Sequence, residues 1–170
     1  SNSDLSLVGA SAEVGTFMSP ILLRVKDSST AVNVHEIEAF GPVSSVMSYN
    51  KVEEAVALSK KGKGSLCCSI TTHDQSVATE FVRNAASMHG RILVLDRECA
   101  KESTGHGSPL PLLVHGGPGR AGGGEEMGGL RGVRHYMQRT AIQGHPSMLT
   151  AITEQFQPGA AQPESEPHVF

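Results

Sequence analysis

Short apolar runs alternate along this chain with amphipathic segments. Runs suited to strands lie at 21–25, 43–47, 66–70 and 92–95. Between the last three, residues 51–61 and 75–88 place apolar side chains at the three- and four-residue spacing of a helix that faces a core. A strand, helix, strand, helix, strand order gives two consecutive crossover units. The pattern therefore predicts an α/β fold, with helices packed against a parallel sheet.

Capping and stop residues predict where the first two helices begin and end. Asn50 precedes Glu53 by three residues, which is capping-box spacing, and Gly62 supplies the stop of that helix. Asp74 is suited to cap the second helix, and we expect Gly90 to end it. The second helix should turn one face inward: Val77, Ala78, Phe81, Val82, Ala85 and Met88.

Three more elements and a linker are expected toward the C-terminus. A helix is predicted where Leu130, Val133 and Met137 share a face, and a brief strand at 140–143. Pro146 suits the first position of a last helix. Its inward face would carry Met148, Leu149, Ile152 and Phe156. Prolines and a glycine then predict a linker over 157–167.

A glycine-rich stretch occupies residues 105–129. Residues 117–122 match G-x-G-x-x-G, the pattern of dinucleotide-binding loops. Such a loop opens a helix and is followed by an acid about 20 residues on, but the region near Gln143 offers none. A tight loop between packed elements is therefore favoured, although Arg120 and nearby backbone N–H groups could still bind an anion.

Composition excludes several classes of protein. The chain has 170 residues, of which 38% are hydrophobic and 18% charged, and its net charge is −3. These values indicate a soluble globular protein and no nucleic-acid partner. No apolar run approaches the ~20 residues that span a bilayer, and the first residues lack a signal-peptide pattern. We therefore expect a cytoplasmic protein with no membrane partner.

The three cysteines indicate neither a disulfide framework nor a metal centre. Cys67 and Cys68 are adjacent in an apolar run, where a strand would direct them to opposite faces. Buried, reduced thiols are the favoured interpretation. The chain contains no C-x-x-C and no H-E-x-x-H pattern, so no metal site is expected.

Residues 36–43 read Glu-Ile-Glu-Ala-Phe-Gly-Pro-Val. This octet resembles the E-E-x-F-G-P-V signature of the aldehyde dehydrogenase superfamily, with Glu38 at the second glutamate and Phe40 at the aromatic position. Ile37 stands at the first glutamate, which leaves the ribose-contacting position intact. Upstream, residues 15–22 resemble that family's G-Y-F-x-x-P-T-x segment at the right distance.

The later part of the chain resembles one particular group within this superfamily. Residues 115–126 and 138–144 resemble a bifunctional phenylacetate-degradation family, in which an aldehyde dehydrogenase is fused to an enoyl-CoA hydratase-like (oxepin-CoA hydrolase) domain. The resemblance covers nearly the whole chain. It implies that residues 3–156 are the C-terminal part of an aldehyde dehydrogenase catalytic domain and that 157–170 lead toward a following domain.

The resemblance also implies a reaction and a coenzyme. A CoA-linked semialdehyde would be the substrate and NAD or NADP the coenzyme, in a cytoplasmic homo-oligomer. A cysteine thiolate would attack the aldehyde, hydride would pass to the nicotinamide, and a glutamate would activate water. Glu38 would bind the nicotinamide-ribose hydroxyls, because a carboxylate accepts two hydrogen bonds. Phe40 would help to seat the ring.

In the family, both the nucleophile and the base precede the octet. No cysteine precedes Glu36 here, and Cys67, Cys68 and Cys99 match no nucleophile motif. The resemblance thus implies that this polypeptide alone is inactive.

Two alternatives remain open at this level. Glu38 could be a solvated loop carboxylate and Phe40 an ordinary core residue. The chain could instead be an assembly module without chemistry of its own, whose 140–143 strand pairs with another subunit. Three arginines could contact CoA phosphates or form a solvated helix face: Arg131, Arg134 and Arg139.

Overall fold

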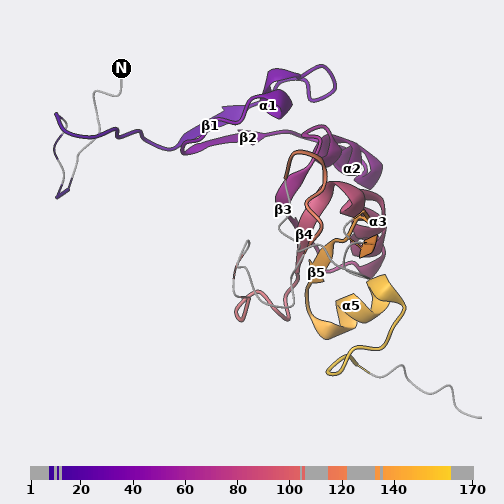
Figure 1. The fold of residues 1–170 in the computed structure, drawn as a ribbon. Helices are drawn as coiled ribbons and strands as arrows, with labels where there is room; N and C mark the ends of the chain where they lie inside the picture. The colour runs from indigo at the N-terminus through magenta and orange to yellow at the C-terminus, as the bar shows by residue number, and fades with distance from the viewer. Residues whose placement is uncertain are drawn as a thin grey trace, which may run out of the picture. The chain divides into compact units, whose positions relative to one another are not determined.

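The computed structural model describes residues 8–9, 11, 13–103, 105, 115–121, 133–134 and 136–161. The chain divides into two compact units, residues 1–50 and 51–170. Each unit is described by itself, and Figure 1 shows their elements.

The first unit contains a parallel pair of strands joined through a single helical turn (Figure 1). The strands are β1 (Ile21–Arg24) and β2 (Val43–Val46), and the turn is α1 (Asn33–Glu36). Ile21 pairs with Val43 at one end of the register and Arg24 with Val46 at the other. Both strands were predicted. Helix α1 was not, because one turn without a side-chain cap leaves no periodic pattern.

The second unit is built on a three-stranded parallel sheet. Its strands are β3 (Ser65–Thr71), β4 (His89–Leu95) and β5 (Ala141–Gln143), in the order β3-β4-β5. Both pairings of the central strand β4 are parallel. The prediction of an α/β fold with a parallel sheet is confirmed.

Three helices lie on the same side of this sheet (Figure 1). They are α2 (Val52–Lys60), α3 (Gln75–Ala85) and α5 (Pro146–Thr153), and a 3-10 turn, η1 (Ala86–Met88), extends α3. Between the helices and the sheet lies a buried cluster: Ala78, Val82, Ile92, Val94, Met148 and Ile152. A smaller cluster joins α2 to α3: Val56, Phe81 and Ala85. Four of the six residues predicted for the inward face of α3 are in these clusters, as are Met148 and Ile152 of α5. Val77, Met88 and Leu149, also predicted to face inward, are half-buried.

The predicted boundary residues of α2 and α3 have different outcomes. The carboxylate of Asp74 accepts hydrogen bonds from the backbone N–H groups of Ser76 (2.8 Å) and Val77 (3.2 Å), as expected of an N-cap. Helix α2 instead has Lys51 at its N-cap, one residue after the predicted Asn50, and Lys51 makes no side-chain cap hydrogen bond. Gly90 lies inside β4 rather than at a helix end.

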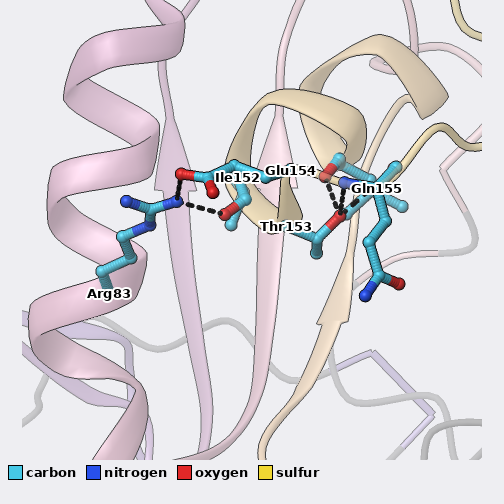
Figure 2. Close-up of polar contacts among 6 residues, drawn as sticks. Arg83, Ile152, Thr153, Glu154 and Gln155 are labelled. Carbon is cyan, nitrogen blue, oxygen red and sulfur yellow. Dashed lines mark hydrogen bonds and ion pairs between the residues drawn. The ribbon is translucent and has the colours of Figure 1, made fainter.

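Helix α5 begins as predicted, with Pro146 in its first turn and His145 as its N-cap. It ends at Glu154, whose φ of 58° is left-handed. Arg83 of α3 donates to the carbonyl of Ile152 (3.3 Å) and pairs with the Glu154 carboxylate (Figure 2). Because both charged side chains are largely exposed, this pair adds little stability. Phe156, expected to face inward, lies beyond the helix and is 55% exposed.

The helix expected around residues 130–137 lies partly outside the described residues. Val133 and Arg134 are helical, but Val133 and Met137 are both exposed rather than packed inward. Leu130 and Arg131 fall outside the described residues, as does the linker beyond residue 161. The boundary at residue 156 stays a prediction.

Candidate functional site

The segment that carries Glu38 and Phe40 connects α1 to β2. It ends in a tight turn, where the N–H of Val43 donates to the carbonyl of Gly41 (2.7 Å). The N–H of Ile21 in β1 donates to the carbonyl of Pro42 (2.8 Å), which fixes the segment to the strand pair. The octet is thus anchored at its end, and Glu38 stands five residues before β2.

Both predicted coenzyme contacts face solvent. Glu38 is exposed, and Phe40 is 92% exposed with a φ of 39°. A bulky residue with positive φ is uncommon and costs about 1–3 kcal/mol, and such positions cluster at functional sites. Phe40 is not a core residue within the described structure. An accessible carboxylate two residues from an accessible aromatic ring fits a sugar diol joined to a planar ring, but the role of both residues stays a prediction.

The described part of the glycine-rich stretch, residues 115–121, is packed against other elements. The N–H of Arg120 donates to the carbonyl of Lys63 (3.0 Å), and a Cβ built on Gly64 would lie 2.1 Å from the carbonyl oxygen of Pro118. Gly119 opens only a 3-10 turn, η2 (Gly119–Ala121). The interpretation of a tight loop between packed elements is confirmed for these residues, and residues 122–132 lie outside the description.

His115 has a structural position in the same loop. Its ring covers Gly90, where a Cβ would lie 2.6 Å from Nδ1. The Nδ1 atom accepts a hydrogen bond from the N–H of Gly117 (3.1 Å). Burial, followed by the charge of Arg91, lowers the pKa of His115. The His115 ring therefore lies so close to the backbone of β4 at residue 90 that only glycine fits there, which explains a glycine inside a strand.

A cleft of about 240 Å³ lies where β4 and β5 end. In parallel sheets, ligands bind outside the carboxyl ends of the strands. Leu93 of β4 and Gln143 of β5 line the cleft, and the other lining residues follow these strands in the chain. They are Glu98, Cys99, Glu102, Ser103, Gly144, His145 and Pro146. The sequence analysis did not single out this cleft as a site.

Asp96 shapes the loop on one side of the cleft. Its buried carboxylate accepts hydrogen bonds from the N–H groups of Glu98 and Cys99, both at 3.0 Å. Burial alone would raise the pKa of Asp96, but these hydrogen bonds and the nearby His145 lower it. An aspartate placed directly after a buried apolar strand was the signal that could have revealed this loop.

The three cysteines are free thiols. Burial, with a smaller contribution from Cys67, raises the pKa of Cys68 to about 11. A thiol with a raised pKa is a poor nucleophile at neutral pH. The Sγ atom of Cys99 lies 3.6 Å from the carbonyl oxygen of Val94, its hydrogen-bond acceptor. All three cysteines are half-buried, whereas the sequence led us to expect buried thiols.

The described residues lack two further features. They hold no group of three or more His, Cys, Asp or Glu side chains arranged to bind a metal ion. In that same part of the chain, no helix is long and apolar enough to cross a bilayer.

The octet and the parallel sheet are consistent with the class of protein that the family comparison shows. The aldehyde dehydrogenase family matches residues 4–142, and the chain belongs to this family.

Two relatives give a finer comparison. The chain is 50% identical over 167 residues to Protein MaoC of Klebsiella aerogenes, a match that covers 96% of this chain and 50% of the relative. It is 38% identical over 115 residues to 3,4-dehydroadipyl-CoA semialdehyde dehydrogenase of Aromatoleum evansii, which covers 68% of this chain and 22% of that enzyme. The chain thus spans half the length of one relative and about a fifth of the other.

Proposed function

We propose that this chain is the coenzyme-contacting portion of an NAD(P)-dependent aldehyde dehydrogenase that oxidises a CoA-linked semialdehyde in phenylacetate degradation. Family membership supports the reaction class, and the name of the Aromatoleum relative supports the substrate class. The observation that carries the proposal is the octet at 36–43, which presents Glu38 and Phe40 to solvent directly before β2.

In this proposal the chain's own residues bind and orient the coenzyme. The carboxylate of Glu38 accepts hydrogen bonds from the two ribose hydroxyls, which holds the sugar in one orientation. The ring of Phe40 would help to hold the nicotinamide and to exclude water from it. The bound coenzyme would supply the hydride acceptor.

The nucleophile and the general base lie outside this chain in the proposed enzyme. Cys68 has a raised pKa and Cys67 neighbours it on β3, while Cys99 follows β4, far along the chain from the octet. The chain by itself is therefore expected to oxidise no aldehyde. The parent protein is proposed to be a bifunctional homo-oligomer in which a hydratase-like domain follows residue 170.

The test uses a chimera of the Aromatoleum enzyme in which residues 3–156 of this chain, the predicted dehydrogenase portion, replace the corresponding segment, so that β5 and α5 stay with the rest of the second unit. We expect Glu38→Gln to raise the KM for the coenzyme about 10–100-fold, because a hydrogen bond to a charged group contributes about 1.5–3 kcal/mol. The unfolding midpoint should not change. Glu53→Gln, an exposed glutamate of α2, is the matched control. Equal coenzyme KM values for the two variants would contradict the role of Glu38.

An assembly role is the second candidate, and the position of β5 favours it. This strand pairs with β4 through one edge only, and none of the described strands pairs with its other edge. A second subunit would have to join at that outer edge. Sedimentation velocity over a range of concentrations tests this role, and a single monomer peak throughout would contradict it.

A further inference from the structure

The chain folds back along α5 after that helix ends. Glu154 closes the helix with a left-handed φ of 58°, and the segment beyond it, drawn in yellow, runs back beside the helix (Figure 1). We call residues 157–161 the return segment. Gln157 and Ala160 are half-buried, and the N–H of Ala160 donates to the carbonyl of Gln157 (2.9 Å). The return segment is therefore a short turn packed on the second unit, although its proline and glycine are typical of a linker.

Two hydroxyl groups of α5 hold the return segment. Thr150 Oγ1 accepts a hydrogen bond from the N–H of Gln157 (2.9 Å), and Ser147 Oγ accepts one from the N–H of Ala161 (3.0 Å). Residues three apart lie on the same face of a helix. The buried residues of α5 are separate from these two. One face of the helix thus packs into the core, while another binds the backbone of the chain that follows it.

The order of these contacts gives the direction of the return. Gln157 binds a residue in the second half of α5, whereas Ala161 binds one in its first turn. Between them, Gly159 has a φ of 93°, and a Cβ built there would lie 3.4 Å from the Cγ atom of Pro146. Pro146 also lines the cleft where β4 and β5 end. The chain thus passes from the end of α5 back to its start, which borders the cleft.

We propose that the return segment makes the chain leave the second unit beside this cleft, and not at the C-terminal end of α5. A helix rises about 1.5 Å per residue, so the eight residues of α5 move the exit point by about 12 Å. Any polypeptide after residue 161 then starts from a fixed point at the carboxyl edge of the sheet. In the parent protein proposed above, the following domain would be tethered next to the cleft, and this consequence alone rests on the proposed function.

Hydrogen exchange and NMR of this chain test the proposal without turnover, so a failure here leaves the proposed function standing. The amides of Gln157 and Ala161 should exchange at least about 10-fold more slowly than in an unstructured chain. A nuclear Overhauser effect should link protons of Gly159 and Pro146, because these residues are in contact. Unprotected amides in the folded chain, or the absence of that effect, would overturn the proposal.

Paired substitutions at one hydroxyl separate its hydrogen bond from a general change in stability. Thr150→Val removes the acceptor and keeps the shape of the side chain, so the Gln157 amide should exchange about 2–10-fold faster. Thr150→Ser keeps the hydroxyl and should leave the protection in place. Equal exchange rates in the two variants would contradict the role of the hydroxyl.

A substitution within the return segment covers the case in which the helix variants do not fold. Gly159→Val places a β-branched residue at positive φ, which is strongly disfavoured. The amides of Gln157 and Ala161 should then lose their protection, while the unfolding midpoint changes little. Gly62→Val is the matched control, since a Cβ there meets nothing within 4 Å. Amides that stay protected in Gly159→Val would show that the return segment does not pack on α5 in this way.

Discussion

The two units of this chain use parallel strands in opposite ways. Ile92 and Val94 of β4 are completely buried between helices and sheet, whereas all four residues of β1 are exposed although three are apolar. The same kind of apolar run is therefore buried in one unit and exposed in the other. The comparison shows that an apolar strand sequence does not by itself tell whether its side chains are buried within the same unit.

The largest expected effect comes from removing a core side chain. Ile92→Ala should lower the free energy of unfolding by about 2–5 kcal/mol, because it removes methyl groups from a filled cluster. Leu22→Ala in β1 should change it by no more than about 0.5 kcal/mol. Urea unfolding of both variants measures the difference. Similar losses in the two variants would show that the first unit has a core after all.

A smaller effect is expected where the glycine loop meets the turn after α2. Gly64→Ala should cost about 1–3 kcal/mol, because φ is 120° there and a Cβ would lie 2.1 Å from the carbonyl oxygen of Pro118. Gly62→Ala is the matched control, since a Cβ there meets nothing within 4 Å. Thermal unfolding checks both. A neutral Gly64→Ala would mean that the loop does not pack on this turn in solution.

The smallest effect is a pH dependence that belongs to the second unit. His89 is buried, its Nδ1 lies 2.7 Å from Ser65 Oγ and its Nε2 lies 3.3 Å from Ser59 Oγ. Burial, followed by the charge of Lys60, lowers its pKa. Below about pH 6.5 the unfolded chain binds a proton that the folded chain resists, so the free energy of unfolding should fall as pH decreases from 7 to 5.

His89→Gln should reduce this pH dependence but not remove it, because the pKa of His115 is lowered too. His73→Gln, at an exposed position, should leave it in place. Urea titrations at several pH values measure the slope. An unchanged slope in His89→Gln would assign the proton uptake to another group.

Local chemistry predicted much of the second unit. Asp74 and Pro146 begin their helices as expected, because a cap and a first-turn proline act through neighbours in sequence. Gly90 was misassigned, since its role depends on His115, a residue from a distant loop. The cleft at the ends of β4 and β5 escaped prediction for the same reason. Tertiary neighbours decide such positions, and sequence spacing does not show them.

At the proposed site, Glu38 and Phe40 were singled out by the sequence motif. The structure shows why the spacing of apolar residues could not have pointed to them. The residues lie in an irregular connection, where neither the two-residue nor the 3.6-residue pattern applies. Phe40 would be assigned to a core by its hydrophobicity alone, yet its side chain is 92% exposed.

The pairing of β5 with β4 has a consequence for the order of folding. Strands β3 and β4 are joined through α3 alone, while Arg91 of β4 pairs with Ala141 across the whole glycine-rich stretch. Closing so long a loop is entropically costly and slow. The β3-α3-β4 unit should therefore assemble first, with β5 and α5 arriving late. During synthesis, residues up to Ile152 must therefore leave the ribosome before Met148 and Ile152 can complete the buried cluster of the second unit.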